Sequence, residues 1–275
     1  MSNFQLSGLE GRVAVVTGAG RMRSIGRPIA QTLAQAGCHI VLTGTGRQPE
    51  AYPEDEKQAD WRDIASVAEA VRGCGVDALE LVSDVTDPDS VERLVEHTLS
   101  RFGRVDFVIN NAGAARGADR VPVTELSLDE WHKVMNVNLN GTFYMSRAFG
   151  RVLKEREAGG AIVNISSIAG KALPPNTAAY AASKAGIQAF SASMAREMGR
   201  YNVRVNTICP GVIDTYRMDD VGRGDAWRHL LKNIPLGRPG SGEDVANMVA
   251  YLCSDQGAWI TGQAYNVDGG HVVQH

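Results

Sequence analysis

The chain has 275 residues, of which 44% are hydrophobic and 21% charged, with a net charge of −3 and a pI near 6.1. This composition excludes collagen-like and largely disordered chains and allows a sizeable core. It offers no broad basic surface for nucleic acid, no apolar run long enough to span a membrane and no cationic, apolar leader. We therefore expect a cytoplasmic protein that binds neither nucleic acid nor membrane.

The cysteines and histidines do not form the patterns of a disulfide framework or a zinc site. The six histidines lack ligand spacing, and no C-x-x-C pair occurs among the four cysteines, Cys38, Cys74, Cys209 and Cys253. We expect reduced, mostly buried cysteines and no bound metal.

Short β-branched runs alternate with longer amphipathic segments along the chain. Strands are expected at residues 13–17, 39–43, 78–82, 105–110, 161–166, 203–208 and 264–268. Between them lie helical patterns, such as residues 90–103, which follow an Asp-Pro-Asp start signal and end at a glycine. This alternation indicates βαβ units. We predict an α/β fold with a doubly wound, Rossmann-type, parallel seven-stranded sheet, helices on both faces, and a single domain over residues 1–275.

Residues 46–61, GRQPEAYPEDEKQADW, interrupt this pattern with charge and proline. They are predicted to form an exposed loop after the second strand. Such charged loops are usually solvated connections, and a binding role is the minority interpretation.

The first strand runs into the glycine-rich stretch TGAGRMRSIGRPIA. Glycines there would let backbone amides approach a pyrophosphate, and the following helix would direct its positive end at it. Alone, the stretch could be only a tight connection. Asp84 after the third strand, placed to accept from an adenine amino group, and NNAG at 110–113 after the fourth strengthen the prediction, because ligands bind where parallel strands end.

Tyr180 and Lys184 stand four positions apart in an alanine-rich helical stretch. Their side chains would be neighbours, so the ammonium would lower the pKa of the phenol and suit it to exchange a proton with an alcohol or ketone. That spacing also occurs by chance. Ser167 at the end of the fifth strand could meet the same substrate oxygen, and Asn138, in the helix before that strand, could hold a water in a proton relay.

With NNAG, NISS and Tyr-x-x-x-Lys together, the sequence resembles the compact branch of the short-chain dehydrogenase/reductase family from about Leu9 to about Gly270, closest in character to 3-oxoacyl thioester reductases. The resemblance implies Tyr180 as general acid/base, Ser167 as the group that orients the carbonyl, Lys184 as partner of the tyrosine and the nicotinamide ribose, and Asn138 in the relay. It further implies hydride transfer at the nicotinamide C4 without a metal, and homotetramers or dimers built on the long helices flanking the fifth strand.

The glycine motif departs from the family's T-G-x-x-x-G-x-G pattern. Two extra residues lie between Thr17 and Gly26, and Ser24 replaces the middle glycine. We expect Ser24 to give its hydroxyl to a phosphate; the alternative is that it only tolerates the wider turn.

The choice of cofactor rests on the end of the second strand, where Gly44 replaces the acid that would bind ribose hydroxyls. Arg23 and Arg47 could reach a 2′-phosphate, which favours NADP(H). NAD(H) is the alternative, with the acid supplied by Glu50, Glu54 or Asp55. The full set expected to bind the cofactor is Gly18, Gly20, Arg23, Ser24, Ile25, Gly26, Gly44, Thr45, Arg47, Asp84, Val85, Asn111, Ala112, Gly113, Tyr180, Lys184, Pro210, Gly211, Ile213 and Thr215.

Residues 215–237 are expected to form a mobile lid over the substrate. Their arginines could meet an anionic substrate but are more typical of a solvated helix face, and the same doubt applies to two cations elsewhere; the five are Arg217, Arg223, Arg228, Arg116 and Lys171. The resemblance allows acyl thioesters, sugars, polyols, steroids and small ketones.

We therefore expect an oxidoreductase that transfers hydride between a nicotinamide cofactor and a secondary alcohol or ketone. The alternative is a catalytically silent NAD(P)-binding sensor or scaffold of the same fold, although no catalytic position is lost. The epimerase branch, which also uses Tyr-x-x-x-Lys, is disfavoured because only residues 269–275 follow the last strand.

Overall fold

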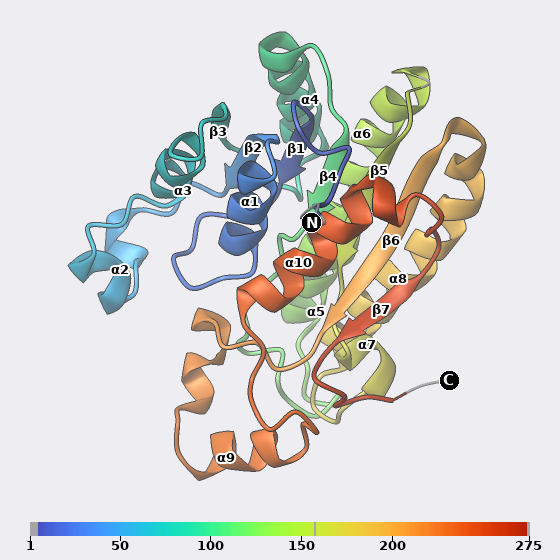
Figure 1. The fold of residues 1–275 in the computed structure, drawn as a ribbon. Coiled ribbons are helices and arrows are strands. Elements are labelled where there is room, and N and C mark those ends of the chain that lie inside the picture. The colour runs from blue at the N-terminus through green and yellow to red at the C-terminus, as the bar shows by residue number, and fades with distance from the viewer. Residues whose placement is uncertain (1–4, 157, 274–275) are drawn as a thin grey trace.

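A parallel sheet of seven strands forms the centre of the computed structural model, which describes residues 5–156 and 158–273 (Figure 1). The order across the sheet is β3-β2-β1-β4-β5-β6-β7. The strands are β1 Val13–Val16, β2 His39–Gly44, β3 Ala78–Val82, β4 Phe107–Asn110, β5 Gly160–Ile165, β6 Val203–Pro210 and β7 Ala264–Val267. The predicted fold class and strands are confirmed, with bounds that differ by two residues at most.

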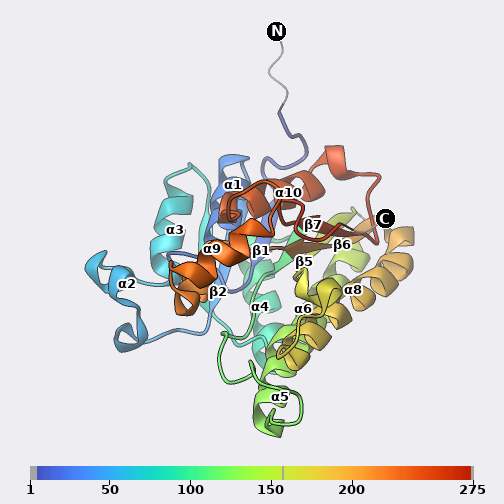
Figure 2. The same ribbon diagram turned by 90° about the horizontal axis from the view of Figure 1, so that it is seen from below.

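Helices cover both faces of this sheet, as predicted, with α1, α3 and α10 on one face and α4, α6 and α8 on the other (Figure 2). The α-helices are α1 Gly26–Gln35, α2 Glu54–Gln58, α3 Ile64–Arg72, α4 Pro88–Phe102, α5 Leu128–Met135, α6 Gly141–Arg156, α7 Ala169–Ala172, α8 Ala178–Met198, α9 Asp225–Lys232 and α10 Gly242–Cys253. Shorter helical turns are η1 Pro49–Ala51, the π-helical η2 Asn136–Asn140, η3 Gly199–Tyr201, η4 Tyr216–Val221 and η5 Asp255–Gly257.

The strand β1 shows why the sheet needs both layers. All four of its residues are buried, and they alternate between two cores. Ala14 and Val16 pack with α1 and α10, whereas Val13 and Val15 pack with α4 and α6. Strands buried on both faces read as continuous apolar runs, which explains why VAVV carries no alternation of polar and apolar residues.

Helix ends follow local signals in the sequence. At α4 the Asp87 side chain accepts from the Asp89 amide at 3.0 Å, Pro88 occupies the first turn, and Gly103 ends the helix at φ +67°. The start of α10 carries a capping box in which Ser241 and Asp244 satisfy each other's backbone amides.

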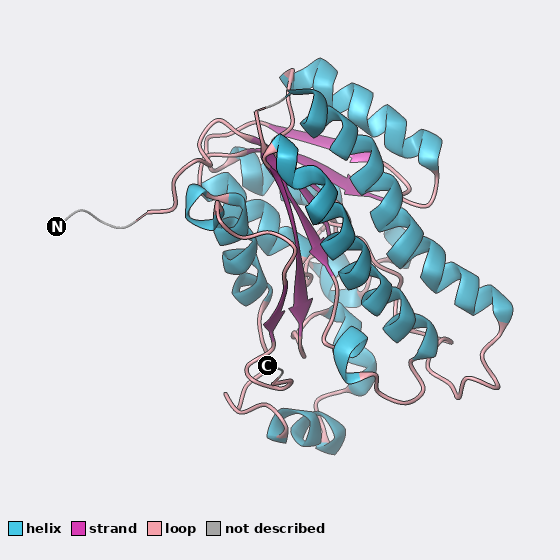
Figure 3. Ribbon diagram, turned by 90° about the vertical axis from the view of Figure 1, so that its right-hand side faces the viewer, coloured by secondary structure: helices cyan, strands magenta, loops and turns pink. Residues whose placement is uncertain are grey.

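The order of the strands reverses between β1 and β4, so the loops that follow these two strands diverge at the carboxyl edge. Such a point is where open α/β sheets bind ligands. The segment with η4 and α9 lies below this edge in Figure 1, and Figure 3 shows α9 apart from the helical layers, at the end of the sheet near the C-terminus.

Two further expectations concern the described residues. The four cysteines are free, and all except Cys74 are buried, as predicted. Among the helices of the described ranges, none is both long and apolar enough to cross a membrane.

Candidate active site

A cavity of about 490 Å³ opens at the carboxyl edge of the sheet. This volume is within the range of small-molecule and cofactor sites. Its wall combines the glycine-rich loop, the ends of β2, β3 and β5, the NNAG segment, α8 and residues 215–220. The predicted convergence of these distant segments is therefore present in the structure.

The glycine-rich loop is joined to NNAG by a network of hydrogen bonds. The Asn111 side-chain amide donates to the carbonyls of Thr17, at 2.8 Å, and Gly18, at 3.0 Å. In return, the Thr17 hydroxyl accepts from the amides of Asn111 and Ala112, both at 3.0 Å. Gly18 has φ +64°, and a Cβ there would lie 2.8 Å from the Ala112 Cα, so this approach of two backbones requires glycine.

Residues 46–61 are not the solvated loop that we predicted. They form η1 and α2, and side chains from the end of this segment reach back to the glycine-rich loop. The Trp61 indole donates to the Gly20 carbonyl at 2.6 Å, and Glu56, 1% exposed, accepts from the Met22 amide at 2.8 Å. Charge and proline in the sequence concealed these two buried anchors.

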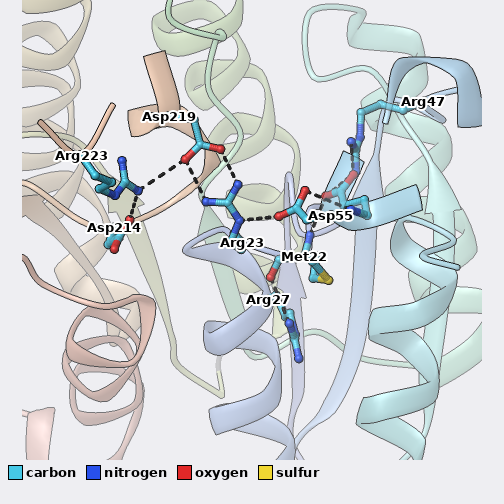
Figure 4. Close-up of polar contacts among 9 residues, drawn as sticks. Met22, Arg23, Arg27, Arg47, Asp55, Asp214, Asp219 and Arg223 are labelled. Atoms are coloured by element: carbon cyan, nitrogen blue, oxygen red, sulfur yellow. Dashed lines mark hydrogen bonds and ion pairs between the residues drawn. The ribbon is translucent and has the colours of Figure 1, made fainter. Parts of the chain in front are cut away.

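Arg23 is held between the same segment and the lid (Figure 4). Its Nε donates to Asp55 at 2.6 Å, and its two terminal nitrogens donate to the carboxylate of Asp219 in η4. The hydrogen bonds from Asp219 are the main cause of the raised pKa of Arg23, although partial burial opposes it. One arginine thus connects the glycine-rich loop, α2 and η4.

Arg47 is held in a comparable way at the end of β2, where it donates to Glu56 at 2.7 Å and to Asp63 at 2.9 Å. Asp63 is buried, has φ +53°, and its second oxygen has no hydrogen-bond partner among the described residues. A Cβ on Gly44 would lie 3.5 Å from that oxygen. Asp63 therefore places a carboxylate beside the position where Gly44 lacks one.

Tyr180 and Lys184 share one face of α8 and both line the cavity, as their spacing predicts. The Lys184 ammonium lies 5.8 Å from the centre of the Tyr180 ring and donates to the Ile165 carbonyl at 2.8 Å. Burial opposes ionisation of the phenol, but the charges of Arg217 and Lys184 outweigh it, so the pKa of Tyr180 is lowered. Burial in turn lowers the pKa of Lys184.

Ser167 follows β5 and accepts from the Ala169 amide at 3.1 Å. It lies close enough to the Tyr180 phenol for its hydroxyl to favour the ionised form and contribute to the lowered pKa. The two side chains could therefore meet one substrate oxygen.

Asn138 lies behind this pair in the π-helical turn and is fully buried. Its Oδ1 accepts from the Ala114 amide at 2.8 Å, and its Nδ2 donates to the Ser183 hydroxyl at 2.9 Å. A Cβ on Gly113 would lie 3.4 Å from Asn138 Oδ1 and 4.0 Å from Lys184 Nζ. The amide oxygen and the ammonium thus border one small space, as a relay between them would require.

Known proteins share this arrangement over nearly the whole chain. A family model described as enoyl-(acyl carrier protein) reductase matches residues 18–272. The 3-oxoacyl-[acyl-carrier-protein] reductase FabG of Escherichia coli K12 is 36% identical over 261 residues, covering 95% of this chain and 97% of the relative. A 3-oxoacyl-[acyl-carrier-protein] reductase of Synechocystis is 34% identical over 269 residues, covering 98% and 100%.

Among solved structures, a putative short-chain alcohol dehydrogenase from Sinorhizobium meliloti superposes with a TM-score of 0.84 at 31% identity, covering 97% of each chain. The chain belongs to the short-chain dehydrogenase/reductase family. This short-chain dehydrogenase/reductase is therefore an oxidoreductase that transfers hydride between a nicotinamide cofactor and a carbon bearing an alcohol or keto group.

Most residues predicted for this dehydrogenase/reductase line the cavity, although lining does not test their roles. Those that line it are Gly18, Gly20, Arg23, Ser24, Ile25, Gly44, Thr45, Arg47, Asp84, Val85, Asn111, Ala112, Gly113, Tyr180, Lys184 and Thr215. Of the others, a Cβ on Gly26 would lie 2.6 Å from the Asn111 amide and one on Gly211 would lie 2.6 Å from Asp268, so these two glycines permit close packing beside the site. Pro210 and Ile213 are buried near them.

Two polar side chains have other contacts than we expected. The Ser24 hydroxyl donates to the Arg21 carbonyl at 2.9 Å and accepts from the Arg27 amide at 3.2 Å, so it closes the wider turn and is not free to donate to a phosphate. Lys171 donates to the Ala264 carbonyl at 2.8 Å and to Asn266 at 2.7 Å, which ties α7 to β7.

The predicted lid, residues 215–237, contacts both sides of the cavity. The Tyr216 amide donates to the Arg23 carbonyl at 3.1 Å, and Arg116 pairs with Asp220 at 2.7 Å. A solvated position holds for Arg228, but it is wrong for Arg217, whose guanidinium lies 4.8 Å from the centre of the Tyr180 ring.

Sequence reasoning missed Asp63 and Arg120, which lie in loops without periodicity. Arg120, in the loop after NNAG, lies 4.4 Å over the Tyr180 ring. Its only sequence signal is that it follows the end of a strand that borders the site.

Proposed function

We propose that Tyr180 carries out the proton transfer in the oxidation of a secondary alcohol or the reduction of the matching ketone. In the oxidation, the C–H and O–H bonds of the alcohol break, the hydride passes to the nicotinamide, the proton passes to the phenolate, and a C=O bond forms. The observation that carries this proposal is a tyrosine in the cavity wall beside a buried lysine, with its pKa lowered.

The neighbouring side chains support this role. Ser167 would donate to the substrate oxygen and keep it at the phenol. Lys184 would stabilise the phenolate and bind the nicotinamide ribose, as in the family's pattern. Asn138, fixed by its bonds to Ala114 and Ser183, would continue the proton path from Lys184 toward solvent.

The remaining cavity fits a dinucleotide. The glycine-rich loop approaches Ala112 so closely at Gly18 that no Cβ fits, and it leads into the start of α1, where a pyrophosphate would be stabilised. The partnerless buried oxygen of Asp63 is an acceptor that a ribose hydroxyl would satisfy. The cofactor supplies hydride transfer when bound.

For the cofactor we propose NADP(H), as the sequence favours, because Arg23 and Arg47 both line the cavity. A 2′-phosphate would have to displace or share the carboxylates that already pair with these arginines. Asp63 specifically supports NAD(H) as the second candidate, since a carboxylate at this place binds ribose hydroxyls and repels a phosphate. Separate titrations with NADP⁺ and NAD⁺ distinguish the two.

The silent sensor or scaffold is not favoured, because the catalytic side chains are assembled and the relatives named above are reductases. The test is the variant Tyr180→Phe, assayed with a panel of secondary alcohols and ketones by absorbance at the band of the reduced cofactor. We expect turnover to fall by at least about a hundredfold with cofactor binding retained. Tyr144→Phe, on α6 in the core, is the matched control. Full turnover by Tyr180→Phe would overturn the proposal.

We also propose a homo-oligomer, a tetramer or dimer, formed through α6 and α8. These two long helices run side by side over the same face of the sheet (Figure 3). Phe143 on α6 is 42% exposed and lies edge-on to Phe190 on α8 at 6.0 Å, which gives the outer surface an aromatic patch. Light scattering after size exclusion would give the mass, and a monomer at micromolar concentration would contradict the proposal.

A further inference from the structure

Two guanidinium groups lie against the Tyr180 ring. The guanidinium carbon of Arg120 is 4.4 Å from the ring centre and that of Arg217 is 4.8 Å away. Arg120 comes from the loop after NNAG and Arg217 from the lid, so two separate segments deliver cations to the proposed catalytic side chain. Lys184 supplies a third positive charge from α8.

The carboxylates nearby do not balance these charges. Arg217 donates to the Ala114 carbonyl, and within the described ranges no carboxylate lies at ion-pair distance from it. Arg120 lies 3.4 Å from Asp119, but its Nη1 is buried and makes no hydrogen bond to a described residue. Donors in this state have unused capacity for an acceptor.

The lid also contains arginines with an ordinary surface role, which makes the difference visible. Arg228, with 64% of its side chain exposed, pairs with Asp225 at 2.5 Å on α9. Arg116 is likewise paired, with Asp220 at 2.7 Å. Arg217, in contrast, lines the cavity, contacts a backbone carbonyl and has no anionic partner in the described chain.

Like charges held this close repel each other. Burial first, and then the nearby Arg217, lower the pKa of Arg120 against the effect of Asp119. An anion bound between the two guanidiniums would relieve this repulsion and satisfy the free donor. A carboxylate suits the planar fork of arginine, and a short one fits beside the ring of the proton-transferring residue.

We propose that the substrate is a small hydroxy acid, or the matching oxo acid, whose carboxylate is bound by Arg217 with the help of Arg120. This inference rests on the proposed function, because the alcohol carbon must lie at Tyr180 while the carboxylate lies at the arginines. The carboxylate is unchanged in the reaction. It fixes the orientation of the substrate, which distinguishes this enzyme from one that accepts a neutral thioester.

The test compares acids with their own esters. The enzyme and its cofactor are assayed with 2-hydroxybutanoate and 3-hydroxybutanoate and with the methyl ester of each. We expect at least one acid to have a kcat/KM about tenfold or more above that of its ester, as the loss of a hydrogen-bonded charge pair predicts. Butanoate should also inhibit competitively, and butanamide should not.

The variant Arg217→Gln should lower kcat/KM for the acid by about 10- to 100-fold and leave the ester within about twofold. Arg228→Gln in the same lid is the matched control and should change neither. Arg217→Lys should recover part of the loss, and thermal melting checks that each variant is folded.

An ester used as well as its acid, or an Arg217→Gln variant that affects both forms equally, would overturn the carboxylate inference and leave the proposed function standing. No turnover of acids, esters or neutral ketones with either cofactor would instead overturn the proposed function itself, and this inference with it.

Discussion

Glu56 provides a test of how the inserted segment supports the cofactor site. Its side chain is 1% exposed; it accepts from the Met22 amide at 2.8 Å and from Arg47 at 2.7 Å. A hydrogen bond to a charged group contributes about 1.5–3 kcal/mol. If only the bond to Met22 is needed to hold the glycine-rich loop in its binding conformation, Glu56→Ala should weaken cofactor binding by about 10- to 150-fold.

Titration calorimetry with NADP⁺ and NAD⁺ measures this loss directly. Glu54→Ala is the matched control, because Glu54 lies on the same helix, is exposed, and has only a 3.4 Å contact from Gln58. It should bind within about twofold of the parent protein, since exposed contacts contribute little. Equal affinity of the two variants, with urea unfolding showing that Glu56→Ala is folded, would refute the reasoning.

Three further predictions concern the cavity wall. Gly18→Ala should lose stability and cofactor affinity, by about 1–3 kcal/mol, whereas Gly75→Ala, which also has positive φ but nothing within 4 Å of its Cβ, should bind cofactor normally; similar cofactor affinities of the two in calorimetry would count against the close approach at Gly18. Asp63→Asn should shift the ratio of affinities toward NADP⁺ by about tenfold, because a negative charge near the 2′ position is removed; an unchanged ratio in paired titrations would remove Asp63 from cofactor selection. Lys184→Met should raise the pKa of Tyr180, since the ammonium favours the phenolate, so the acidic limb of the pH profile for alcohol oxidation should move to higher pH; a limb that stays in place would show that Lys184 does not tune the phenol.

The sheet was predictable because burial on both faces leaves a strong local pattern. Each strand of the parallel sheet is an apolar, β-branched run, and each is followed by a loop that leads to an amphipathic helix, as at β1 and α1. The pair Tyr180 and Lys184 was predictable for a similar reason, because a spacing of four on a helix fixes which side chains are neighbours.

The parts that escaped prediction depend on contacts between segments far apart in the sequence. Residues 46–61 have the composition of a solvated loop, and only Glu56 and Trp61, two side chains in sixteen positions, bring them back to the glycine-rich loop. Asp63 reaches the end of β2 through a backbone with positive φ, which carries no sequence signal in a non-glycine residue. Arg217 looked like a surface charge because its partner, the Tyr180 ring, belongs to another element.

The π-helical turn at Asn136–Asn140 links the chemistry of the protein to its core. It joins α5 to α6 and contains one more residue per turn than an α-helix would, which offsets the two helices by about 100° of rotation. Deleting one residue there would restore an uninterrupted helix but would force a choice of phase. Either Asn138 would rotate away from Ala114 and Ser183, or Phe149 and its neighbours would turn off the sheet, so this single extra residue lets one continuous rod serve two separate orientations.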